Sequence, residues 1–272
     1  MPALPFFLSG PARVWCVPPD HAGWLRWADP NGKQVFRMAE ALPVARRWAV
    51  GALLVMTFAT GLVDAVSFLR LGHVFVANMT GNVVFLGFSF ARDTRLPVLA
   101  PIVAMTAFVL GSFGGGQLSK AFGGRPRHWL RGAFAGQAAG LALTSVLLGT
   151  GALRPEGRTV LLVVALLGAC SGLQNATVRL LAPRDLTTTV LTQTLTALTA
   201  ESVLGAGTGT RPHRRIGSVL AMFAGAACGA LLLQATLAGV VGLAAALVAG
   251  AACVFALAPE ERSGQPSATT AG

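Results

Sequence analysis

The chain has 272 residues, of which 54% are hydrophobic and only 11% charged, and its mean hydropathy is +0.65. A water-soluble domain of this size could not easily hide so much apolar surface, so the composition predicts a polytopic membrane protein. The 21 Lys and Arg, against 10 Asp and Glu, would suit nucleic-acid binding only if they formed a patch on one face. They instead stand at the ends of apolar segments, so we expect the lipid bilayer as a partner and no nucleic acid.

The N-terminal 47 residues differ from the rest, with several Pro and Gly and mixed charge. They lack the uninterrupted apolar core of a signal peptide, so we expect a disordered cytoplasmic tail over 1–47. Met38 begins a more typical start directly ahead of the first apolar segment. One hypothesis is therefore that residues 1–37 are an extension or the product of a misassigned start. Residues 259–272 are expected to form a second disordered tail.

Between the tails, the chain contains eight apolar segments that predict an all-α membrane domain over 48–258. The segments are 48–69, 74–91, 97–118, 132–152, 159–178, 187–207, 216–233 and 236–257. The second carries Asn78, Thr80, Gly81 and Asn82, and the sixth is rich in Thr. Both are too polar for a helix that faces lipid along its whole length.

The basic residues favour one topology over another. If all eight segments cross, the block Lys120, Arg125, Arg127 and Arg131 falls outside. If 74–91 and 187–207 are short or re-entrant, that block moves to the cytoplasm, as the positive-inside rule requires. We therefore predict six full spans plus two short or re-entrant helices, with both termini cytoplasmic.

Six spans divide into two halves with three crossings each, about 48–153 and 159–257. An odd number of crossings inverts the second half, so the halves would form two inverted repeats. Inverted repeats with broken helices are a recurrent construction of secondary transporters, with the solute site between the copies. The alternative is a duplicated bundle that encloses no cavity.

Two polar islands support the duplication. Residues 60–65, Thr-Gly-Leu-Val-Asp-Ala, return at 171–176 as Ser-Gly-Leu-Gln-Asn-Ala, and Thr80-Gly81-Asn82 is echoed by Thr192-Gln193-Thr194. Hydrocarbon tolerates such groups only where they line a cavity or find partners. The candidate residues of a solute or ion path are Asp64, Asn78, Thr80, Gly81, Asn82, Asn175, Thr192 and Gln193, with Glu201 as a secondary candidate.

Asp64 and Glu201 are the acidic residues placed within apolar segments. A carboxylate there must be paired, hydrated or protonated, so Asp64 is a candidate proton carrier. The alternative is a structural group that accepts hydrogen bonds from a neighbouring helix or from Arg70. Gly81 can interrupt a helix and expose backbone groups to a ligand, whereas the neighbouring Asn and Thr could merely fasten helices together.

Other motifs carry no chemistry. Cys16, Cys170, Cys228 and Cys253 lack the spacing of a metal site or a disulfide framework, and the run that ends at Lys120 lacks the spacing of a phosphate loop. We expect no cofactor, no metal and no enzymatic activity. Glycines spaced by four predict close helix packing; examples are Gly111 with Gly115, Gly168 with Gly172, and Gly225 with Gly229.

The run GLVDAVSFLRLGHVFVANMTGNVVFLG at 61–87, with SGLQNATVRLL at 171–181, resembles the YoaK family of bacterial membrane proteins, also called domain of unknown function 1275. The resemblance covers about 48–257 and implies a bacterial inner-membrane protein with about six helices. It brings no established substrate or catalytic residue. The chain departs from the family pattern at Gln193, where a second Thr-Gly pair would be expected.

Two functional hypotheses follow. The first is a secondary transporter of a small solute, with Asp64 as the titrating group if transport is coupled to protons. The second is a membrane-embedded binding or scaffold protein that transports nothing, in which the polar islands only hold helices together. The sequence leaves the solute and the oligomeric state open.

Overall fold

The computed structural model describes the chain in two compact units, 1–42 and 43–272. The described residues are 24–28, 34–38, 46–91, 98–122, 125–181, 196, 198–199 and 212–257. In the first unit, strands β1 (Trp24–Ala28) and β2 (Gln34–Met38) pair antiparallel, with Trp24 opposite Met38. The sequence patterns did not predict this hairpin.

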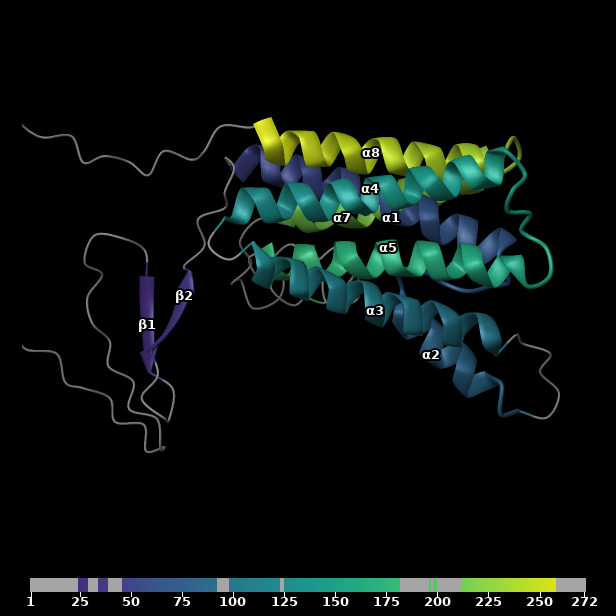
Figure 1. The fold of residues 1–272 in the computed structure, drawn as a ribbon, viewed down its shortest axis with the longest axis horizontal. Helices are drawn as coiled ribbons and strands as arrows, with labels where there is room; N and C mark the ends of the chain where they lie inside the picture. The colour runs from purple at the N-terminus through teal and green to yellow at the C-terminus, as the bar shows by residue number, and fades with distance from the viewer. Residues whose placement is uncertain are drawn as a thin grey trace, which may run out of the picture. The chain divides into compact units, whose positions relative to one another are not determined.

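The described part of the second unit is all helical (Figure 1). Its helices are α1 (Arg46–Arg70), α2 (Met79–Phe88), α3 (Leu99–Ala121), α4 (Pro126–Gly149), α5 (Thr159–Leu181), α7 (Pro212–Leu232) and α8 (Leu237–Leu257). All except α2 are long and apolar enough to cross a membrane, which makes six candidate spans among the described residues. A span of this length reaches roughly 30 Å, the thickness of the hydrocarbon core.

Helix α2 is different because its 10 residues reach only about 15 Å. The prediction of six full spans is thus confirmed, and the first of the two predicted short elements is a short helix. The second, 187–207, lies outside the described residues except for positions 196, 198 and 199.

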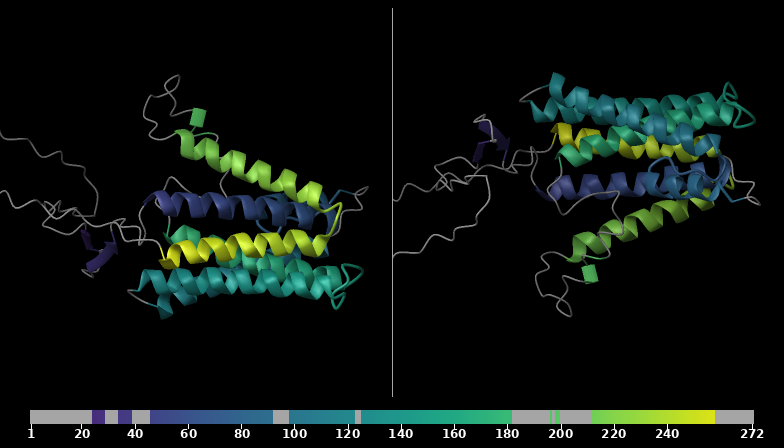
Figure 2. Two further views of the ribbon diagram at one scale, coloured as in Figure 1. Left: turned by 90° about the horizontal axis from the view of Figure 1, so that it is seen from above. Right: turned by 90° about the horizontal axis from the view of Figure 1, so that it is seen from below.

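The long helices pack in three principal pairs: α1 with α7, α3 with α5, and α4 with α8. Figure 2 shows α1 between α7 and α8. Helix α1 is the most enclosed of the candidate spans, since 72% of its most apolar stretch is buried. Large apolar side chains on the outer helices are exposed, as lipid contact requires; examples are Phe113 on α3 and Phe223 on α7.

Two of these pairs are built on the same glycine contacts. A Cβ atom at Gly225 of α7 would overlap the carbonyl oxygen of Phe58 on α1, and one at Gly111 of α3 would overlap that of Ala169 on α5. Backbones can approach so closely only where a side chain is missing, as in small-residue membrane interfaces. The glycine spacing therefore correctly predicted close packing.

The correspondence extends one turn further along both pairs. A Cβ at Gly229 would lie 2.9 Å from the Cβ of Ala65, and one at Gly115 would lie 2.9 Å from the Cβ of Ala176. Ala65 and Ala176 are the matching ends of the repeated six-residue motif. The α1–α7 and α3–α5 interfaces thus repeat the same contacts, and each joins one helix of the first half to one helix of the second.

Candidate functional site

Asp64 lies on α1 and is 4% exposed. Its Oδ1 accepts hydrogen bonds from the backbone N–H groups of Val76, at 3.2 Å, and Ala77, at 3.0 Å. Its Oδ2 accepts from Nδ2 of Asn78, at 2.9 Å. The carboxylate therefore holds the chain that connects α1 to α2, and three donors satisfy it, as buried carboxylates require.

The connection needs this support because its backbone is not helical. Helix α1 ends at Arg70, where Gly72 and His73 take positive φ angles of 92° and 57°. Residues 74–78 then run without regular structure before α2 begins. Irregular backbone inside a membrane bundle is tolerated only where its polar groups find partners in the protein or face a water-filled cavity. Asp64 supplies two of those partners.

Asn82 supplies further partners from the other side of the connection. It is fully buried, its Oδ1 accepts from the N–H of Phe75 at 2.9 Å, and its Nδ2 donates to the carbonyl of Phe75. Gly81 is required beside it, since a Cβ there would stand 2.7 Å from the ring of Phe75. The sequence-predicted residues Asp64, Asn78, Gly81 and Asn82 thus come together around one short stretch of backbone.

Aromatic rings cover this stretch. Phe75 stacks on Phe68 of α1, with centroids 5.0 Å apart, and on Phe85 of α2, at 5.9 Å. His73 meets Phe68 edge-on at 5.4 Å. Such ring pairs add stability beyond the burial of their area, so α2 is fastened to α1 by both polar and aromatic contacts.

The remaining candidates do not join this cluster. Thr80 is exposed on α2. Asn175 is half-buried on α5, and its Nδ2 donates to the carbonyl of Ser171 in its own helix, at 2.9 Å. Arg70 donates to the carbonyl of Leu233 at the end of α7, at 3.2 Å, and not to Asp64. Thr192, Gln193 and Glu201 lie outside the described residues.

A second polar group, which sequence reasoning missed, lies in the interior of the bundle. Gln174 of α5 is 4% exposed; its Nε2 donates to Oγ1 of Thr60 on α1, at 2.9 Å, and its Oε1 accepts from Nε2 of Gln137 on α4. Thr60 in turn donates to the carbonyl of Met56, at 2.9 Å. The three side chains join helices from both halves near the middle of α1 and α4.

One atom of this group has no partner among the described residues: the Oε1 of Gln137, whose side chain is 3% exposed. A buried amide oxygen without a donor costs about 1–3 kcal/mol, so such atoms are rare in folded proteins. The sequence signal was a lone Gln in each of two apolar helices. Gln174 belongs to the repeated motif, whereas nothing in the sequence relates Gln137 to it.

No group of three or more His, Cys, Asp or Glu that could hold a metal ion occurs among the residues the structure describes. The polar side chains that do meet in the bundle are a carboxylate and neutral amides and hydroxyls. They can bind solute donors, water or a proton, but they form neither a nucleophile with its base nor a ligand set.

These features define a multi-pass membrane protein with a helical bundle, a short accessory helix and polar groups in its interior. The profile of the family described as "Protein of unknown function (DUF1275)" matches residues 52–254, and the chain belongs to this family. The chain is 30% identical over 149 residues to the UPF0700 transmembrane protein YoaK of Bacillus subtilis (strain 168). The aligned residues make up 54% of this chain and 64% of that protein. No solved structure matches.

Proposed function

We propose that this protein is a secondary transporter of a small solute, located in the bacterial inner membrane with both termini in the cytoplasm. The observation that carries the proposal is the buried group of Thr60, Gln137 and Gln174. It joins helices of both halves, and it leaves the Oε1 of Gln137 without a donor among the described residues. Secondary transporters typically bind their solutes near the middle of the membrane, where the two repeats meet.

The chemistry of this group supports a polar, uncharged ligand. Its three side chains are neutral, so they offer no counter-ion to a fully charged solute that has lost its water. The free oxygen of Gln137 can accept an N–H or O–H group. A small solute that donates hydrogen bonds would satisfy this oxygen, and the bundle would then contain no unpaired group at this point.

The pairing of the helices supports an inverted repeat. Exchanging α1 with α5, α3 with α7, and α4 with α8 converts the α1–α7 pair into the α5–α3 pair and returns α4–α8 to itself. The glycine contacts at Phe58 and Ala169 follow the same exchange. Rocking of one such half against the other is how transporters of this construction expose a central site to each side in turn.

Coupling to protons would involve Asp64. Thr60 and Asp64 are four residues apart on α1, so they lie on the same face of the helix. A proton on Asp64 would remove the charge that strengthens its bonds to the α1–α2 connection. Protonation would therefore loosen the attachment of α2 to α1 near the proposed solute path. Binding of a proton would in this way be coupled to a movement of α2. Asp64→Asn is expected to fold and insert but to lose coupled uptake.

The test uses accessibility, because it needs no known solute. Thr60→Cys is placed in a chain whose four native cysteines are replaced, and it is treated with a membrane-impermeant thiol reagent in vesicles of each orientation. Alternating access predicts labelling from both sides. The matched control, Ala244→Cys on α8, replaces a fully buried residue outside the polar group and is expected to react from neither side.

The competing candidate is a membrane-embedded binding or scaffold protein that transports nothing. It is favoured by the carboxylate of Asp64, which accepts hydrogen bonds from Val76, Ala77 and Asn78 in the adjoining connection to α2. In that case the interior never opens, so Thr60→Cys would be protected from both sides. That result would eliminate the transporter and leave the scaffold. Neither candidate assigns a catalytic residue or a cofactor.

A further inference from the structure

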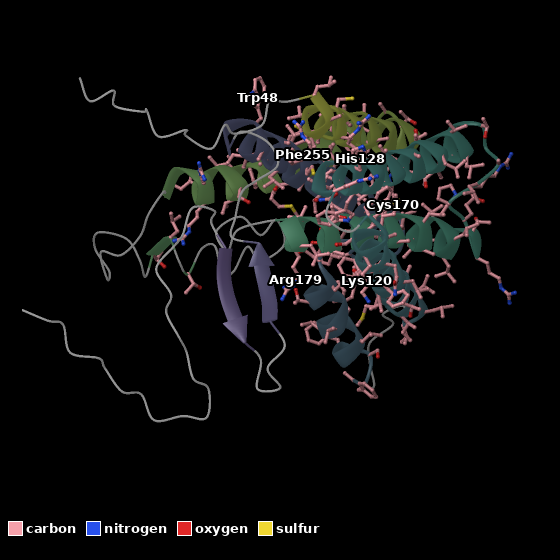
Figure 3. All side chains as sticks on the ribbon, turned by 60° about the vertical axis from the view of Figure 1, so that its left-hand side comes forward. Trp48, Lys120, His128, Cys170, Arg179 and Phe255 are labelled. Atoms are coloured by element: carbon pink, nitrogen blue, oxygen red, sulfur yellow. The ribbon has the colours of Figure 1, made fainter. Side chains whose placement is uncertain are left out.

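The turn between α3 and α4 collects basic side chains without any acidic neighbour in sequence. Lys120 is exposed in the last turn of α3, and Arg125, His128 and Arg131 are exposed at the start of α4 (Figure 3 labels Lys120 and His128). The sequence contains no acidic residue between Asp93 and Glu156. The charge of this turn is therefore not neutralised within its own two helices.

The start of α4 adds a further preference for anions. Its N-cap residue is Arg125, which makes no capping hydrogen bond with its side chain, and no acidic residue stands in the first turn. The first N–H groups of a helix lack partners within the helix and carry positive partial charge. In α4, Pro126 has no N–H and the N–H of Trp129 donates to the carbonyl of Arg125, so the N–H of His128 is the clearest backbone donor of this turn. An Asp, Ser or Thr normally meets this need, and here nothing of that kind occupies the cap position.

A buried donor without a partner lies one turn into the same helix. Trp129 is 7% exposed, and its indole Nε1 has no acceptor among the residues that the structure describes. Trp129 follows Arg125 by four residues, so both lie on one face of α4. Tryptophan is frequent at membrane interfaces, where the ring packs in apolar surroundings and the N–H binds a polar group.

We propose that this turn binds the phosphate-bearing headgroup of an anionic phospholipid. Lys120, Arg125 and Arg131 supply the charge, and the start of α4 and the Trp129 N–H supply directed donors. A lipid fits better than a free anion because the turn lies where two spans end, at Ala121 and Arg127. The acyl chains would cover the exposed apolar side chains of α3, namely Val109, Leu110 and Phe113.

The experiment measures binding of phosphatidylglycerol to the full chain in non-ionic detergent, by native mass spectrometry and by the shift in melting temperature. Phosphatidylcholine serves as the neutral lipid. The test variant is Arg125→Gln/Arg131→Gln, and the matched control is Arg154→Gln/Arg158→Gln, which removes two exposed arginines at the opposite ends of the helices. Because each basic group near a lipid surface contributes about fivefold, we expect the test variant, which lacks two, to bind at least tenfold more weakly and the control to bind like the parent.

Trp129→Phe separates a built site from general attraction. This variant keeps an aromatic ring at the position and all the charges but loses the N–H donor, so we expect phosphatidylglycerol binding to weaken about threefold to tenfold. If the arginine variant does not fold, Trp129→Phe and the charge-retaining Arg125→Lys/Arg131→Lys still decide the question. The lysine variant is expected to bind more weakly than the parent but better than the glutamine variant.

Several results would overturn the proposal. If the two double arginine variants lose phosphatidylglycerol binding equally, the lipid is held by general electrostatic attraction and not by a site. Undiminished binding by Trp129→Phe would mean the same. Inorganic phosphate that protects the protein as well as phosphatidylglycerol does, and competes with it, would assign the turn to a soluble anion instead. A parent protein that treats both lipids alike would leave no lipid site at all.

Discussion

Replacing Asp64 by Ala tests how the α1–α2 connection is held. The substitution removes the acceptors of the N–H groups of Val76 and Ala77, which are 0% and 4% exposed. Asp64→Asn is the informative partner variant, because its amide oxygen can still accept from both N–H groups. Comparison of the two separates the loss of the acceptor from the loss of the charge.

The expected size follows from the two buried donors. A buried N–H without an acceptor costs about 1–3 kcal/mol, so Asp64→Ala should lower the free energy of unfolding by about 2–6 kcal/mol. A loss of that size lowers the melting temperature by roughly 5 °C or more. Asp64→Asn should lose less than half as much, because only the charge and the bond to Asn78 are disturbed.

Thermal unfolding in detergent gives the stabilities, and amide hydrogen exchange localises them. Exchange at Val76 and Ala77 should accelerate in Asp64→Ala before other segments respond. The control is Ser67→Ala on the same face of α1, since Ser67 is fully buried but donates only to the carbonyl of Asp64, at 3.1 Å. The carboxylate does not hold the connection if Asp64→Ala and Ser67→Ala have the same melting temperature and amide hydrogen exchange at 76–77 stays unchanged in Asp64→Ala.

Two further predictions concern helix packing. Gly225→Ala and Gly111→Ala should each destabilise the protein by about 1–3 kcal/mol, because the added Cβ overlaps a backbone carbonyl of the facing helix; Gly116→Ala, with nothing within 4 Å, is the control on α3 and should be neutral or slightly stabilising in the same melting assay. Arg70→Met should lower the free energy of unfolding by about 0.5–1.5 kcal/mol, because it removes the hydrogen bond to the carbonyl of Leu233 at the end of α7. An equal loss in Arg70→Lys would show that a point charge cannot replace this bond.

The six spans were predictable because length and uninterrupted apolar composition determine them directly. A short element at 74–91 was predicted because the segment is too polar for a lipid-facing span and because the flanking charges fit the positive-inside rule better with six crossings than with eight. The pairing of helices was not predictable in the same way. Spacing of Gly225 and Gly229 by four shows that something approaches closely, but only the structure identifies the partner as α1.

The candidate site was predicted in part. The polar island could be found because Asn78, Gly81 and Asn82 interrupt an apolar run, yet the sequence left open whether they line a cavity or fasten helices. In the structure Asn78 donates to the carboxylate of Asp64, Asn82 bonds the backbone of Phe75, and Gly81 leaves room for the Phe75 ring. Gln137 was not predicted, because a single amide in an apolar helix is common. Its importance depends on its contact with Gln174 of α5, which is 37 residues later in the sequence.

The two halves agree in packing but differ in chemistry. Asp64 and Asn175 hold the same place in the repeated motif. The carboxylate accepts three bonds from the α1–α2 connection, whereas the amide of Asn175 donates to Ser171 in its own helix. An amide does not titrate, so in the described parts of the two islands only Asp64 can carry a proton. If transport is proton-coupled, the coupling therefore acts on the first half, and α2 is the element whose attachment the proton would change.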